Sequence, residues 1–183
     1  MRLFIAVPLP EKLKVALREF QPYFPGNGIR FIPEENLHLT LHFTGDTPAE
    51  KLPELLHKLT AVSARNTGFT LTFQETAPGP KLNFPRLIWT RFQEHPAFDQ
   101  LGTELCRVTE AAPGAFGKFI PHITLARFRK DLPKPQALPV IREANIPDLQ
   151  VHSFALWQSE LRSPHPVYSI LQEFPLQSSG IIF

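Results

Sequence analysis

Two short segments repeat one pattern of residue types, a histidine, an apolar residue, a threonine and a second apolar residue. The segments are His38-Leu39-Thr40-Leu41 and His122-Ile123-Thr124-Leu125. In an extended strand successive side chains point to opposite faces, so the histidine and threonine of each segment share one face. Two imidazoles brought together can take a proton from one oxygen and deliver a proton to another. The repeat therefore predicts an acid–base site built from both halves of the chain.

His42 follows the first motif and shares its predicted polar face, so we expect it to line the same site. A substrate-binding imidazole and a solvated strand edge both remain open for this residue. A metal site made of His38, His42 and His122 is a further alternative. It lacks a carboxylate, and residues four apart on a strand are too distant for routine chelation. We therefore expect neither a metal nor another cofactor.

The composition sets the scale of the molecule. At 183 residues and 43% hydrophobic content the chain is long enough for one domain, which we expect to span residues 1–183. A net charge of +2 permits an anionic substrate. A single cysteine, Cys106, excludes an internal disulfide. With no segment that resembles a signal peptide or a membrane span, we expect a cytoplasmic location and no membrane partner.

The spacing of apolar residues predicts an α+β fold with antiparallel strands. The expected strands and helices alternate with short connections, and the helices are 10–20, 48–64 and 96–111, with strands at 2–7, 36–43, 68–73, 87–92, 119–127, 151–161 and 167–174. Alternation in the first motif strand places Phe43 on the core face with Leu39 and Leu41. In the second motif strand it places Arg127 opposite His122 unless the strand bends near Ala126.

The two motifs resemble the signature of the 2H phosphoesterase superfamily. Their surroundings resemble its bacterial and archaeal RNA 2′,3′-cyclic phosphodiesterase branch, also called 2′-5′ RNA ligase. The similarity covers nearly the whole chain, including residues 2–6, 36–45, 121–127 and 157–161 followed by Tyr168. It implies an α+β fold of two pseudo-symmetric lobes, with antiparallel sheets lining a central cleft and helices on the outer faces. His42 and Thr44 depart from the lysine and leucine of many relatives.

The resemblance also implies metal-independent hydrolysis of a 2′,3′-cyclic phosphate. His38 matches a general acid that protonates the leaving 3′ oxygen, and His122 matches a general base for water, which would leave a 2′-phosphate. The hydroxyls of Thr40 and Thr124 match groups that hold the phosphate, and Arg127 matches a phosphate-contacting arginine. The implied partner is an RNA or oligonucleotide with a 2′,3′-cyclic phosphate end, and we expect the protein to be a monomer.

Other functions fit the same residues. One is a non-catalytic module of this fold that binds RNA or another anion. Another is an enzyme whose main activity is 2′-5′ RNA ligation or hydrolysis of a small cyclic nucleotide or ADP-ribose cyclic phosphate. Four phenylalanines near the motifs are typical of core positions, although one at the rim of a cleft could stack on a nucleobase. These are Phe4, Phe31, Phe43 and Phe119.

Overall fold

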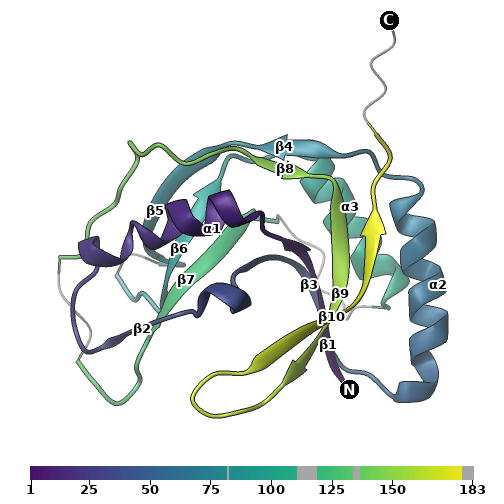
Figure 1. Ribbon diagram of the computed structural model, residues 1–183, viewed down its shortest axis with the longest axis horizontal. Coiled ribbons are helices and arrows are strands. Elements are labelled where there is room, and N and C mark those ends of the chain that lie inside the picture. Colours follow the sequence, from purple (N-terminus) through teal and green to yellow (C-terminus); the bar gives the residue numbers. More distant parts are fainter. Residues whose placement is uncertain (82, 111–118, 134–136, 179–183) are drawn as a thin grey trace, which may run out of the picture.

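A computed structural model describes residues 1–81, 83–110, 119–133 and 137–178. It confirms the α+β fold that the periodicity predicts (Figure 1). The three α-helices and ten strands of the described residues are β1 (Arg2–Pro8), α1 (Glu11–Arg18), β2 (Ile29–Phe31), β3 (His38–Asp46), α2 (Leu52–Ser63), β4 (Phe69–Leu71), β5 (Phe73–Gly79), β6 (Leu87–Phe92), α3 (Pro96–Val108), β7 (His122–Phe128), β8 (Leu149–Val151), β9 (Ser153–Glu160) and β10 (Val167–Pro175).

Eight of these strands form one antiparallel sheet. Its order is β10-β9-β1-β3-β7-β6-β5, with β2 beside β7, and β4 pairs separately with β8. The strands that carry the two motifs, β3 and β7, are neighbours at the centre and join through the pair Leu39 and Ile123. Both of these side chains are fully buried. The two halves of the chain therefore meet in a continuous sheet with one motif on each side of the junction.

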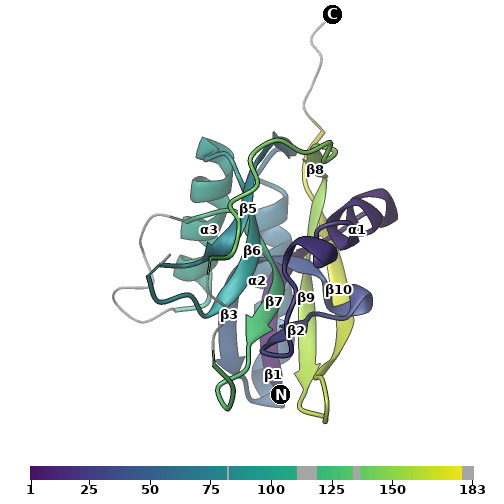
Figure 2. The same cartoon turned by 90° about the vertical axis from the view of Figure 1, so that its left-hand side faces the viewer.

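The arrangement has approximate two-fold symmetry. The unit β1-α1-β3 in the first half corresponds to β6-α3-β7 in the second. In the sheet, β1 lies beside β3 and β6 lies beside β7, with β9 and β5 next outward. Figure 2 shows α1 and α3 on opposite sides of the strands. This symmetry brings two motifs that are distant in sequence to equivalent places at the centre of the sheet.

The ends and faces of the helices follow from their residues. In α1, Leu13 and Leu17 lie one turn apart and are buried, and Phe20 continues the same stripe to stack on Phe73 of β5 at 6.1 Å between ring centroids. At the start of α3, Nδ1 of His95 accepts a hydrogen bond from the backbone N–H of Ala97 at 3.2 Å, and a proline occupies the first helical position. Residues within or next to each helix thus determine where α3 begins and which face of α1 packs on the sheet.

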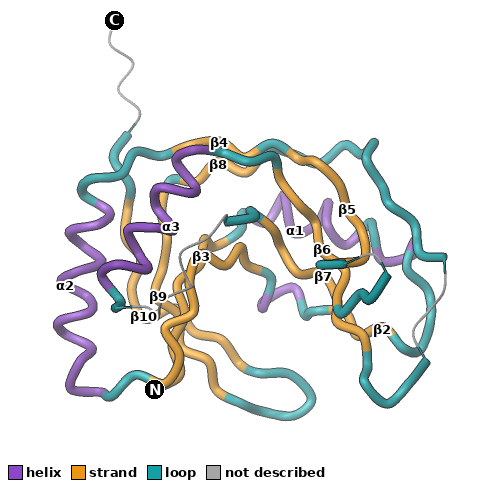
Figure 3. Tube along the Cα trace, turned by 180° about the vertical axis from the view of Figure 1, so that it is seen from behind, coloured by secondary structure: helices purple, strands orange, loops and turns teal. Residues whose placement is uncertain are grey.

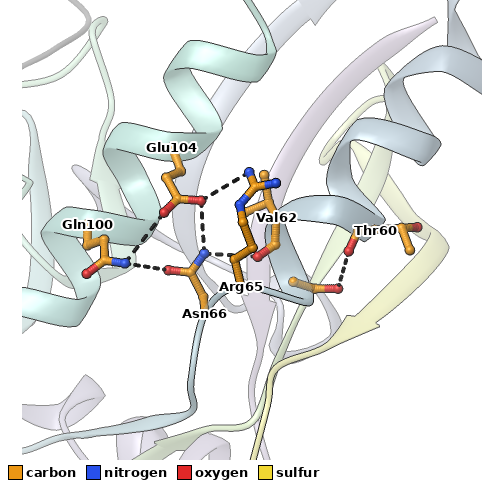
Figure 4. A network of polar contacts seen from close by, with 7 residues as sticks. Thr60, Val62, Arg65, Asn66, Gln100 and Glu104 are labelled. Carbon is orange, nitrogen blue, oxygen red and sulfur yellow. Dashed lines mark hydrogen bonds and ion pairs between the residues drawn. The ribbon is translucent and has the colours of Figure 1, made fainter.

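Helices α2 and α3 pack side by side, and α3 also packs against β3 (Figure 3). A polar network joins the segment just after α2 to the middle of α3. Nδ2 of Asn66 donates to the backbone oxygen of Val62 at 2.9 Å and to Glu104 of α3 at 3.1 Å (Figure 4). Gln100 donates to Asn66 and Arg65 pairs with Glu104. Because Asn66 is buried, these partners are needed to satisfy its amide. The network holds α3 in place behind the motif strand β3.

The predicted helices are all present, although each is shorter than expected at one or both ends. The predicted end of the third helix, residue 111, lies outside the described residues. The predicted strand 68–73 covers β4 and only the first residue of β5, so the rest of β5 was missed. The short strands β2 and β8 were also missed, except for Val151 of β8, because three residues are too few to show a periodicity. Within the described part of the chain no helix is long and apolar enough to cross a membrane.

Candidate active site

A cleft of about 530 Å³ lies over the junction of β3 and β7. It contains all six residues that the sequence singled out, His38, Thr40, His42, His122, Thr124 and Arg127. Because β3 and β7 are antiparallel and Leu39 faces Ile123, His38 lies towards Thr124 and Thr40 towards His122. The fold therefore gathers two imidazoles and two hydroxyls into one space.

The two motif imidazoles are held in the same way. Nδ1 of His38 lies 2.7 Å from the backbone oxygen of Asn36, and Nδ1 of His122 lies 2.7 Å from the backbone oxygen of Ile120. A carbonyl oxygen only accepts hydrogen bonds, so each Nδ1 carries the proton and donates it. In each neutral ring Nε2 then holds the lone pair, free to take a proton or, once protonated, to give one.

The cleft favours the neutral form of both imidazoles. Burial lowers the pKa of His38 to about 4, against the smaller raising effect of its hydrogen bond to Asn36. Burial also lowers the pKa of His122, and the positive charges of Arg91 and Arg127 lower it further. A bound anion would raise the pKa of both imidazoles, because negative charge beside an imidazole favours its protonated form. We therefore expect the imidazoles to take up protons more readily when a phosphate is bound in the cleft.

Aromatic rings pack against both imidazoles. Around His38 lie Phe4 at 4.9 Å and Tyr168 at 5.4 Å between ring centroids, and the ring of Trp89 lies 5.0 Å from that of His122. Tyr168 comes from β10. The loop before it is tied to the segment just before the motif strand, because the side chain of Asn36 donates to the backbone oxygen of Pro166 at 2.8 Å. Trp89 belongs to no motif that sequence reasoning found. Its only signal was a large aromatic residue in a strand that flanks the second motif.

Arg127 lies in the cleft because of a β-bulge. Ile88 of β6 pairs with Ala126 and the next residue pairs with Thr124, so Leu125 is an extra residue in β7. An extra residue reverses the alternation beyond it, which turns Arg127 onto the face of His122. The strand is thus irregular beside Ala126, which is the exception under which the sequence analysis allowed Arg127 to leave the face opposite His122. Arg127 lines the cleft, and its positive charge contributes to lowering the pKa of His38 and His122, which line it too.

A family model described as the 2′-5′ RNA ligase superfamily matches residues 9–162. The chain belongs to this superfamily. A relative from Thermus thermophilus named RNA 2′,3′-cyclic phosphodiesterase is 37% identical, over 97% of this chain and 91% of its own length. One of the same name from Methanocaldococcus jannaschii is 26% identical over 95% of this chain and all of its own.

Solved structures of similar proteins have the same architecture. TT0787 of Thermus thermophilus superposes with a TM-score of 0.85 at 33% identity, covering 98% of this chain and all of that one. LigT of Escherichia coli in complex with 3′-AMP superposes with a TM-score of 0.77 at 29% identity, covering 96% of this chain and 98% of that one. This agreement confirms the fold class that the resemblance implied.

His42 comes directly after the first motif. One of its ring nitrogens contacts Cys106 of α3, and the other contacts Thr109, the residue that follows α3. Nε2 lies 3.0 Å from Oγ1 of Thr109, and Nδ1 lies 3.4 Å from Sγ of Cys106. The hydroxyl of Thr109 donates to the backbone oxygen of Leu105, so Nε2 of His42 carries the proton of that contact. Burial also lowers the pKa of His42. His42 lines the cleft, but its pairing with Ile5 after the register shift turns the imidazole towards α3, so it does not share the face of His38 and Thr40 as the alternation predicted. Both of its ring nitrogens contact protein atoms, so the predicted substrate-binding role stays a prediction.

Phe43 corrects the sequence-based assignment of its side chain to the core. Ile5 of β1 pairs with His42 and Ala6 pairs with Thr40, so Leu41 is an extra residue in β3. As in the second motif, this bulge reverses the alternation beyond it. The ring of Phe43 is 67% exposed and lines the cleft. The two motif strands thus carry bulges at equivalent positions, Leu41 and Leu125.

Among the residues that the structure describes, no group of three or more histidine, cysteine, aspartate or glutamate side chains is placed to hold a metal ion. The nearest histidine to the motif pair in sequence, His42, makes contacts through both ring nitrogens with Cys106 and Thr109. The groups that the cleft offers for chemistry are the two motif imidazoles, the hydroxyls of Thr40 and Thr124, and the guanidinium of Arg127.

Proposed function

We propose that this protein hydrolyses 2′,3′-cyclic phosphates at the ends of RNA or nucleotides without a metal ion, using residues from both halves of one domain, residues 1–183. The observation that carries the proposal is the pair of imidazoles, each with Nδ1 bonded to a backbone oxygen and Nε2 available in one cleft. The name shared by the relatives from Thermus and Methanocaldococcus, RNA 2′,3′-cyclic phosphodiesterase, supports the substrate. The crystal structures of Escherichia coli LigT in complex with 3′-AMP and with phosphate support a nucleotide phosphate as the kind of ligand.

In the proposed reaction His122 acts as the general base. Its Nε2 takes a proton from a water molecule, whose oxygen forms a bond to phosphorus. Binding of the anionic substrate favours the protonated form of His38, which then also carries a proton on Nε2. The bond from phosphorus to the 3′ oxygen breaks, and protonated His38 gives its Nε2 proton to that oxygen. The products are a 2′-phosphate and a free 3′-hydroxyl. Because two imidazoles supply both proton transfers, the chemistry needs no further group to activate water.

The remaining polar groups stabilise the charge that develops on the phosphate. Thr40 and Thr124 can each donate one hydrogen bond to a non-bridging oxygen. Arg127 adds a fixed positive charge and a planar set of donors suited to phosphate. Donors already held in place by the sheet need little rearrangement during the reaction, which makes them effective in catalysis.

The test is hydrolysis of a short RNA ending in a 2′,3′-cyclic phosphate, measured in EDTA for the wild type, His38→Ala and His122→Ala. We expect chelator-resistant activity that falls by about 100- to 10,000-fold in each variant, the range for loss of a general acid or base. His57→Ala, which replaces a histidine of α2 outside the cleft, is the matched control and should keep full activity. Product analysis distinguishes a 2′-phosphate from a 3′-phosphate.

An inactive wild type, or full activity in both variants, would overturn the catalytic proposal and favour the non-catalytic binding module. Loss of activity in EDTA would overturn the metal-independent mechanism. Incubating the cyclic-phosphate RNA with an RNA that ends in a 5′-hydroxyl would reveal 2′-5′ ligation as a joined product.

A further inference from the structure

A row of charged residues crosses the sheet and ends at the histidine of the second motif. Glu75 of β5 is paired with Arg91 of β6, and Arg91 is paired with His122 of β7. Residues directly opposite each other on antiparallel strands share one face, with Cβ atoms at most about 5.5 Å apart. Arg91 therefore lies between a carboxylate and the motif imidazole.

The guanidinium of Arg91 is held by contacts with two side chains. Its Nη1 lies 3.1 Å from Oε1 of Glu75, and its Cζ lies 5.5 Å from the centroid of the Trp89 ring. The ring of Trp89 in turn packs against that of His122. The side chains of Arg91 and Glu75 are only 24% and 13% exposed, so solvent screens their charges weakly. A positive charge is thus fixed beside the ring that contacts His122.

Glu75 does not fully neutralise Arg91, because it has a second partner. Its Oε2 lies 3.3 Å from Nε of Arg142, so two guanidinium groups share one carboxylate. In addition, Nε of Arg91 is buried and has no hydrogen-bond partner among the described residues. A buried donor without a partner lowers stability. The charge that Arg91 presents to the second motif therefore explains its position better than its hydrogen bonds do.

The first motif lacks a charge of this kind. His38 is paired with Pro8 of β1, whereas His122 is paired with Arg91. Burial is the main cause that lowers the pKa of both imidazoles, and the charge of Arg127 adds to it on both sides. The charge of Arg91 lowers the pKa of His122, while the charges that act on His38 are those of His122 and Arg127. Arg91 thus breaks the two-fold symmetry of the site.

We propose that Arg91 is a positioning residue whose fixed charge makes His122, rather than His38, the proton acceptor of the pair. The inference rests on the proposed function and deepens it. The negative charge of a bound cyclic phosphate favours protonation of both imidazoles, and Arg91 opposes this effect at His122. His122 then remains able to take a proton from water, while His38 becomes the donor to the leaving oxygen.

Other titratable or charged side chains also face His122 in the cleft. Within the described part of the chain they are His38, His42, Arg127, His165 and Tyr168. All of them are common to the wild type and to variants at Arg91 and Glu75. A change in the titration of His122 between these proteins therefore reports the charge row.

The test compares Arg91→Gln with Glu75→Gln, each of which removes one charge and keeps a side chain that can form hydrogen bonds. The Cε1–H resonance of His122, assigned by its absence in His122→Gln, gives the titration midpoint. The midpoint should move to higher pH in Arg91→Gln and to lower pH in Glu75→Gln. Arg91→Lys keeps the charge and should restore the wild-type midpoint. Arg65→Gln, which removes an arginine from an ion pair with Glu104 outside the cleft, is the matched control and should match the wild type.

The pH profile of kcat with adenosine 2′,3′-cyclic phosphate gives a second measurement, because it reports the groups that transfer protons in the enzyme–substrate complex. One limb of the profile should move to higher pH in Arg91→Gln and to lower pH in Glu75→Gln. A purely structural role would lower kcat in both variants without shifting the limb in opposite directions. If Arg91→Gln does not fold, Glu75→Gln and Arg91→Lys still give both measurements.

Equal midpoints in the wild type and the two glutamine variants, or shifts of the same sign, would overturn the inference. Midpoints that shift while both limbs of the kcat profile stay in place would overturn it as well. Opposite midpoint shifts in a wild type and variants that do not hydrolyse the substrate would overturn the proposed function, and would leave the electrostatic effect of Arg91 on His122 standing.

Discussion

The buried imidazole of His38 makes the stability of the fold depend on pH. Its pKa is 6.5 when unperturbed and about 4 in the folded protein. Between these values the unfolded chain binds a proton that the folded chain excludes, so the free energy of unfolding rises with pH. The stabilisation is fully present above about pH 6.5 and is lost as the pH falls towards 4. The whole difference corresponds to about 3 kcal/mol, of which about 2 kcal/mol falls between pH 7 and pH 4.5.

The perturbation that isolates this contribution is His38→Gln, which removes the titrating group and keeps a polar side chain. Urea denaturation of both proteins at pH 7 and pH 4.5 gives four free energies of unfolding. We expect acidification to cost the wild type about 2 kcal/mol more than the variant, because all other titrating groups are common to both. Equal losses in the two proteins would refute the argument from burial.

A direct reading of the same pKa comes from the Cε1–H resonance of His38, assigned by its absence in His38→Gln. Its titration midpoint should lie near 4 in the free protein. Saturating inorganic phosphate should move the midpoint upward, because an anion in the cleft favours the protonated imidazole. A midpoint at the ordinary histidine value in the free protein would contradict the burial that the structure shows.

Two further predictions concern residues that support the cleft. Thr76 of β5 and Thr90 of β6 are fully buried, and their hydroxyl oxygens are 2.7 Å apart. Thr90→Val should lower the free energy of unfolding by about 1–3 kcal/mol, because it leaves the hydroxyl of Thr76 unpaired. The double variant Thr76→Val, Thr90→Val should lose much less, and urea denaturation would measure the difference. A Cβ at Gly79 would overlap the indole of Trp89, which contacts His122. Gly79→Ala should therefore cost about 1–3 kcal/mol in stability and also lower kcat, and normal kcat would show that the position of Trp89 does not matter to the reaction.

Much of this site could be predicted from the sequence. The repeated motif predicted which side chains share a polar face, since within a strand this depends only on the two-residue alternation of the backbone. Leu39 and Ile123 are buried and His38 and Thr40 lie in the cleft, as that alternation requires. The α+β class followed from the same local periodicities, because each strand or helix needs an apolar face to pack.

The tertiary structure decided where the alternation fails. A bulge is a property of how two strands pair, so nothing in β3 or β7 taken alone shows that Leu41 and Leu125 are extra residues. That pairing turned Phe43 out of the core and Arg127 into the cleft. Likewise His42 belongs to a polar face by periodicity, but only the packing of α3 beside β3 supplies the partners that occupy its ring nitrogens. Contacts between segments distant in sequence depend on the folded arrangement, which local periodicity does not contain.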